Sequence, residues 1–128
     1  MTILVEISAG ELLDKITILV IKQERISDPA KLANVRKEHE MLMSVYREQI
    51  AEVPELVTLR NQLTKINSQL WDIEDEIRDH ERRKDFGQRF VELARSVYRT
   101  NDQRSSTKRT INELLKSALV EEKSYSEY

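Results

Sequence analysis

Residues that interrupt helices are scarce in this chain of 128 residues. It has two glycines and two prolines, whereas an average composition holds roughly 7% and 5% of these residues. Leu, Ile, Glu, Lys, Arg and Gln are abundant instead. Because the chain breakers are so few and these helix formers so frequent, the composition favours helix over most of the length.

Cysteine and long apolar runs are both absent. Without cysteine the chain forms no disulfide and no thiolate metal site, which agrees with a reducing compartment. No stretch approaches the roughly 20 apolar residues of a membrane span. The first residues carry no basic segment and their apolar run ends at Glu6, so they do not resemble a secretory signal. We therefore predict a cytoplasmic protein with no membrane span.

Neither sign of charge dominates the chain. Its 21 basic and 23 acidic side chains give a formal net charge of −2. This balance provides no overall attraction to nucleic acid or to an anionic membrane, and we expect no nucleic-acid partner. Charged residues make up 34% and hydrophobic ones 39% of the chain. Such a composition is typical of an elongated bundle with a thin core.

The spacing of apolar residues predicts an all-α fold in one domain, 1–128. We expect an elongated antiparallel bundle of about four helices, at 9–26, 29–51, 54–84 and 86–120, preceded by a short strand or arm at 3–7. Ser8 and Glu11 form a capping box at the first start. Asp28 and Pro29 have the N-cap and first-turn preferences of a second start.

The predicted helix 54–84 carries the most regular apolar stripe. Its apolar residues alternate spacings of three and four without a miss, namely Leu56, Leu59, Leu63, Ile66, Leu70, Ile73 and Ile77. A stripe this strict is typical of coiled-coil packing. Small elongated bundles commonly bury a remaining apolar face by forming a dimer, so a homodimer or a partner protein is expected.

The matching stripe of the predicted helix 86–120 is interrupted by polar residues. Asn101, Arg104 and Lys108 occupy positions where leucine or isoleucine is expected. An antiparallel hairpin about residue 85 would place Asn67 and Trp71 opposite them. These five residues are our candidate ligand or partner site. The alternative is structural, because a polar residue in such a stripe can also fix the register of packed helices.

No metal site or cofactor is predicted. His39 and His80 fall on the core sides of different helices, well over ten residues apart along the axis. Glu76 and Asp79 have the three-residue spacing by which some helical enzymes hold magnesium, but no second acidic pair matches them. We interpret these carboxylates as a solvated helix face.

The sequence resembles a bacterial family of unknown function over nearly its whole length. The segments that carry the likeness are SAGELLDKITIL at 8–19, KLANV at 31–35, LW at 70–71, IED at 73–75, DFG at 85–87, FVELARSVY at 90–98, TND at 100–102 and EEKSY at 121–125. This resemblance implies an association with glycosyltransferases and surface polysaccharide. It implies no activity and no site residues.

Two functions remain open at this point. The first is a non-catalytic helical interaction or accessory module, linked to sugar transfer or surface polysaccharide. The second is an enzyme or binder of a small anion, with the architecture of the all-α chorismate mutases, in which cations inside the bundle clamp a dicarboxylate. Its candidate cations are Lys15, Lys22, Arg95, Arg104 and Lys108.

Overall fold

The chain folds into four α-helices with no strand. The computed structural model describes residues 1–128. Its helices are α1 (Ala9–Arg25), α2 (Pro29–Gln49), α3 (Pro54–Arg83) and α4 (Gln88–Leu114). The predicted all-α class is confirmed, and the ends of the first three helices lie within two residues of their predicted positions. None of the helices combines the length and the apolar composition needed to span a membrane.

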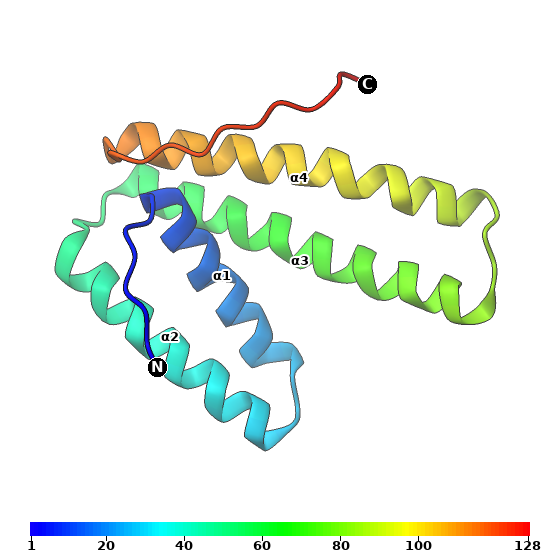
Figure 1. The fold of residues 1–128 in the computed structure, drawn as a ribbon, viewed down its shortest axis with the longest axis horizontal. Helices are drawn as coiled ribbons and strands as arrows, with labels where there is room; N and C mark the ends of the chain where they lie inside the picture. Colours follow the sequence, from blue (N-terminus) through cyan, green and yellow to red (C-terminus); the bar gives the residue numbers. More distant parts are fainter.

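The helices form two antiparallel hairpins that cross obliquely (Figure 1). The long hairpin consists of α3 and α4, and the short one of α1 and α2. α1 lies close to all three other helices, whereas the backbone of α2 lies close to α1 only. The short hairpin covers the half of the long hairpin where α3 begins and α4 ends, and the other half extends beyond it (Figure 1). α1 is therefore the element that joins the two hairpins.

The core lies where α1 crosses the long hairpin. Leu13 of α1, Leu56 and Leu63 of α3 and Ile111 of α4 expose no side-chain surface there. The regular stripe of α3 is buried only in this half. Its later members are half-buried, because α1 and α2 do not extend over them. Beyond the short hairpin, only His80 of α3 and Leu93 of α4 are buried, near the turn that joins the two helices.

Two helix starts follow the predicted capping. The Ser8 hydroxyl accepts a hydrogen bond from the Glu11 N–H at 3.2 Å. The Asp28 carboxylate accepts one from the Lys31 N–H at 2.9 Å, with Pro29 in the first turn. The Glu11 side chain does not complete the capping box, because its carboxylate binds Lys108 of α4 instead.

The predicted start of the fourth helix was wrong by two residues. α4 begins at Gln88, with Gly87 as the N-cap residue and no side-chain capping bond. A helix starting at 86, as predicted, would make the residue before it, Asp85, the N-cap. The Asp85 carboxylate instead accepts a hydrogen bond from the Gly87 N–H at 3.1 Å, so it closes the turn before the helix.

The predicted end of the fourth helix, at 120, was also wrong. α4 ends at Leu114, and Lys116 adopts a left-handed conformation with φ of 51°. The Ser117 N–H then donates to the Asn112 carbonyl at 2.8 Å, which is the closing bond of a Schellman motif. The left-handed residue of such a motif is usually a glycine. Because a lysine takes this position here, the sequence pattern did not reveal the end of the helix.

Residues 1–7 form an extended arm and not a paired strand. No hydrogen bond joins this arm to the helices. Ile3, Leu4 and Val5 expose 73%, 92% and 74% of their surface. Of the two predicted forms, strand or arm, the arm is observed.

Substituting glycine for Lys84 is expected to raise the free energy of unfolding by about 1 kcal/mol. Lys84 follows α3 with φ of 55°, a conformation that costs energy for every residue with a Cβ. Urea denaturation followed by circular dichroism measures the change. Lys84→Ala is the matched control, because it removes the same exposed ammonium but keeps the Cβ. Equal stability of the two variants would contradict the explanation.

Candidate functional site

A buried carboxylate at the centre of α1 organises the polar part of the core. Asp14 is 1% exposed. The Arg104 guanidinium of α4 donates through Nε to Asp14 Oδ1 at 2.9 Å, and through Nη2 to Asp14 Oδ2. Such a two-point contact fixes both the position and the orientation of the pair. The pair therefore attaches α1 to α4 at one register.

α3 joins the same carboxylate through Asn67. The Asn67 amide donates to Asp14 Oδ1 at 2.9 Å and to the Thr17 hydroxyl at 3.0 Å. The Thr17 hydroxyl in turn donates to the Asp14 backbone carbonyl at 2.8 Å. Three helices thus meet at one side chain, and each of them contributes a bonded polar group.

Lys108 lies one turn further along α4 and binds two more carboxylates. Its Nζ is 2.8 Å from Glu11 of α1 and 2.7 Å from Glu121, which follows α4. It is also 4.0 Å from Asp14 Oδ2. The side chain of Lys108 is 9% exposed. We call the whole group the Asp14 cluster: Glu11, Asp14, Thr17, Asn67, Arg104, Lys108 and Glu121.

The charges of the cluster stabilise one another. Burial lowers the pKa of Lys108, but the carboxylates of Glu11 and Glu121 outweigh burial and hold that pKa above its ordinary value. Burial raises the pKa of Glu11, and Lys108 outweighs it, so that pKa is low. The hydrogen bonds from Arg104 to Asp14 raise the pKa of the guanidinium. Glu11, Arg104 and Lys108 are therefore charged at neutral pH.

The amides at the start of α1 are also bonded. The Gly10 N–H donates to Asn112 Oδ1 at 2.7 Å, and the Ala9 N–H donates to Ser117 Oγ at 3.3 Å. With Ser8 capping the Glu11 N–H, the first three amides of the helix all have partners. A helix start attracts anions through its free N–H groups. Here these groups bind the end of α4 instead.

The structure brings together three of the five predicted site residues. Asn67 and Arg104 share Asp14 Oδ1, and Lys108 lies beside them. Asn101 is half-buried and makes no side-chain hydrogen bond. The Trp71 ring lies 5.8 Å from the Arg25 guanidinium of α1, and no hydrogen bond or ion pair joins it to the cluster. Only part of the polar stretch of α4, Arg104 and Lys108, therefore contributes to the polar core.

Sequence reasoning missed the residue at the centre. A signal was present, because Gly10, Asp14, Thr17 and Ile21 follow one another at spacings of four, three and four, and all four are buried. They form a second stripe on α1, beside the apolar one, made mostly of small or polar residues. A stripe of this kind indicates close helix contact, and Asp14 is its charged member.

The predicted acidic face of α3 is engaged in ion pairs. Arg89 binds Glu76 at 2.6 Å, and Arg83 binds Asp79 at 3.0 Å. No group of three or more histidine, aspartate or glutamate side chains is arranged to hold a metal ion. These carboxylates therefore have the arginine partners of a charged helix surface.

The fold and its polar core define an all-α domain of two crossed hairpins, in which a buried carboxylate of the first helix binds a half-buried guanidinium of the last. The chain belongs to the family of unknown function DUF6165, whose model matches residues 3–128. No curated protein and no solved structure matches it.

Proposed function

We propose that this protein is a non-catalytic helical interaction module that forms a homodimer through its N-terminal arm. The observation that carries the proposal is the arm itself. Its backbone is extended and its N–H and C=O groups have no partner within the chain. An unpaired extended segment is a template for pairing with another chain.

The side chains of the arm support a second copy as its partner. Successive residues of an extended chain point to opposite faces, so Ile3, Val5 and Ile7 share one apolar face. All three are β-branched, the type most frequent in paired strands. Two identical arms can pair antiparallel about a twofold axis, which is the commonest symmetry of homodimers.

The Asp14 cluster gives less support to the alternative, a binder of a small anion. Its two cations are already matched by three carboxylates, and every buried side-chain nitrogen and oxygen has a partner. Of the other candidate cations, Lys15 and Arg95 are exposed. An anion would therefore have to displace a carboxylate of the protein to reach Arg104 or Lys108.

We also propose that the module serves sugar transfer or surface polysaccharide. This part of the proposal depends on the family resemblance alone. Its test is the amount and length of surface polysaccharide made by cells with and without the gene. Unchanged polysaccharide would contradict the link and would leave the homodimer as a separate proposal.

Light scattering at micromolar concentration tests the homodimer. The expected mass is twice the 15.1 kDa of one chain, and Val5→Asp is expected to reduce it to that of a monomer with the same helix content. The charge breaks the apolar face of the arm and disturbs no contact within the chain. Met41→Asp is the matched control, because it places the same charge on an apolar side chain of α2 that is 54% exposed. A monomeric wild-type chain would contradict the proposal.

A further inference from the structure

The segment after α4 turns back along that helix (Figure 1). We call residues 118–128 the tail. Side chains provide its contacts with the helices, and the backbone of residues 120–128 makes no hydrogen bond. The tail is therefore held at separate points, each of which can be examined as a contact between a peptide and a surface.

Two consecutive carboxylates of the tail bind two consecutive cations of α4. Glu121 lies 2.7 Å from Lys108 Nζ, and Glu122 lies 3.0 Å from Arg109 Nη1. The pairing has a defined order and direction along the helix. α4 thus presents a pair of neighbouring cations that accepts an acidic dipeptide.

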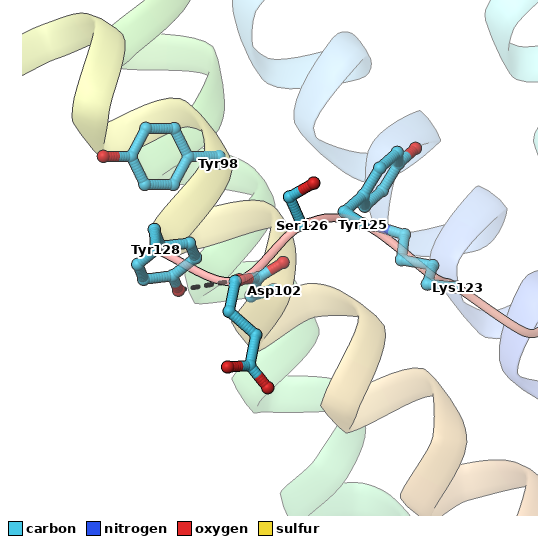
Figure 2. A pocket seen from close by; sticks show the side chains of 7 residues that line it. Tyr98, Asp102, Lys123, Tyr125, Ser126 and Tyr128 are labelled. Carbon is cyan, nitrogen blue, oxygen red and sulfur yellow. Dashed lines mark hydrogen bonds between the residues drawn. The ribbon is translucent and has the colours of Figure 1, made fainter.

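A second contact lies nearer the middle of α4. The Tyr128 hydroxyl donates to the Asp102 carboxylate at 2.7 Å, and its ring lies 4.9 Å from that of Tyr98 (Figure 2). An open hollow lies here between α4 and the tail. The surface therefore combines two cations with an aromatic contact further along the helix, and a peptide with acidic and aromatic residues at this spacing fits both.

The tail is weakly attached to this surface. The side chains of Glu121 and Glu122 are 44% and 71% exposed, and exposed ion pairs contribute little to stability. Fixing the backbone of each tail residue costs conformational entropy. These few contacts exceed the cost of ordering eleven residues only slightly, so the tail exchanges readily between bound and free forms.

The surface keeps its shape when the tail leaves. Lys108 retains Glu11 as a partner, and Arg109 retains Glu113 at 3.7 Å. Lys108 has three donors in all, so departure of Glu121 frees one of them at a fixed position. The site for a carboxylate is thus preformed on α4.

We infer that this face of α4 is a docking site for an acidic segment of a partner protein, and that the tail occupies it as an internal competitor. The matching segment has two adjacent carboxylates and, further along, an aromatic residue, placed as Glu121, Glu122 and Tyr128 are in the tail. The inference rests on the proposed role as an interaction module and does not require the N-terminal arm. Entry of the partner exchanges one pair of carboxylates for another, so the total charge around Lys108 and Arg109 does not change.

Fluorescence anisotropy on the full chain tests this inference. The probe is a labelled peptide with the sequence of residues 118–128, and the opened variant is Glu121→Gln/Glu122→Gln. The tethered tail competes at an effective concentration of the order of millimolar, so we expect the opened variant to bind the probe about tenfold more tightly than the wild type. Glu127→Gln, which removes a tail charge that forms no ion pair, is the matched control and should bind as the wild type does.

Two further measurements make the result decisive. Adding Arg109→Gln to the opened variant should weaken binding severalfold, and a probe with glutamine at both glutamate positions, which lacks both ion pairs, should bind more weakly still. Absence of binding by the opened variant, or equal binding of both probes, would overturn the inference. Light scattering on the same samples reports the arm separately. A dimer that binds no probe contradicts only the docking site, and a monomer that binds it contradicts only the arm.

Discussion

Asparagine in place of Asp14 is expected to lower the free energy of unfolding by about 3–5 kcal/mol. The substitution keeps the size of the side chain but leaves the Arg104 guanidinium without its counter-charge. Its remaining oxygen can still accept from Asn67, but its NH2 group faces Arg104 Nη2, where an acceptor is needed. The Asp14 side chain is 1% exposed and that of Arg104 29% exposed, so water replaces only part of the lost interaction. Urea denaturation followed by circular dichroism measures the loss.

Two further variants separate the burial of this ion pair from its charge. Asp72→Asn removes the carboxylate that pairs with Arg25. The Asp72 side chain is 66% exposed, so this substitution should lower the free energy of unfolding by less than about 1 kcal/mol. Asp14→Leu/Arg104→Met should recover most of the stability that Asp14→Asn loses, because apolar residues often replace a buried ion pair without loss. A double variant as unstable as Asp14→Asn would contradict this account.

Alanine in place of Gly10 is expected to lower the free energy of unfolding by about 2–3 kcal/mol. Helix propensity alone predicts the opposite sign, because alanine favours a helix by about 1 kcal/mol over glycine. The new Cβ would lie 2.5 Å from the Lys108 carbonyl oxygen and 2.9 Å from Asn112 Oδ1. The carbonyl belongs to the backbone of α4 and cannot turn aside, so α1 must move away from α4.

The other glycine of the chain is the matched control for this substitution. A Cβ at Gly87 would lie 3.3 Å from Asp85 Oδ1, which is part of an exposed side chain that can rotate. Gly87→Ala should therefore cost less than about 1 kcal/mol. Thermal unfolding of the two variants compares them directly. Equal melting temperatures would show that the contact between α1 and α4 is looser than described.

Sequence patterns predicted most of the fold because the strongest signals are local. The stripe of α3 and the caps at Ser8 and Asp28 depend on residues three or four apart, and the structure has a helix at each place. The end of α4 depends on a lysine in a left-handed conformation, for which the sequence gives no preference. The oblique crossing of the hairpins depends on the close contact at Gly10, which becomes evident only when both helices are present.

For the candidate site, the sequence predicted the cations of α4 and the amide of α3, but not the carboxylates that bind them. Arg104 and Lys108 were noticeable because they break an apolar stripe, and the antiparallel arrangement placed Asn67 beside Arg104 correctly. Two of their acidic partners, Asp14 and Glu11, come from α1, which is ninety or more positions away, and the third, Glu121, follows α4. Counting residues from the turn of an antiparallel hairpin shows which residues of its two helices face each other. It cannot place a helix of another hairpin that crosses at an angle. Pairing of Asp14 with Arg104 therefore required the arrangement of both hairpins.

The contacts of α1 with the end of α4 also constrain the order of folding. Asp14 and Arg104 are 90 positions apart, and Gly10 and Asn112 are 102 apart, whereas α3 and α4 meet through a short turn. Contacts between near neighbours in sequence form faster than those that close a long loop. During synthesis Asp14 has no counter-charge until α4 has left the ribosome. The contact between the first helix and the last is therefore among the last to form.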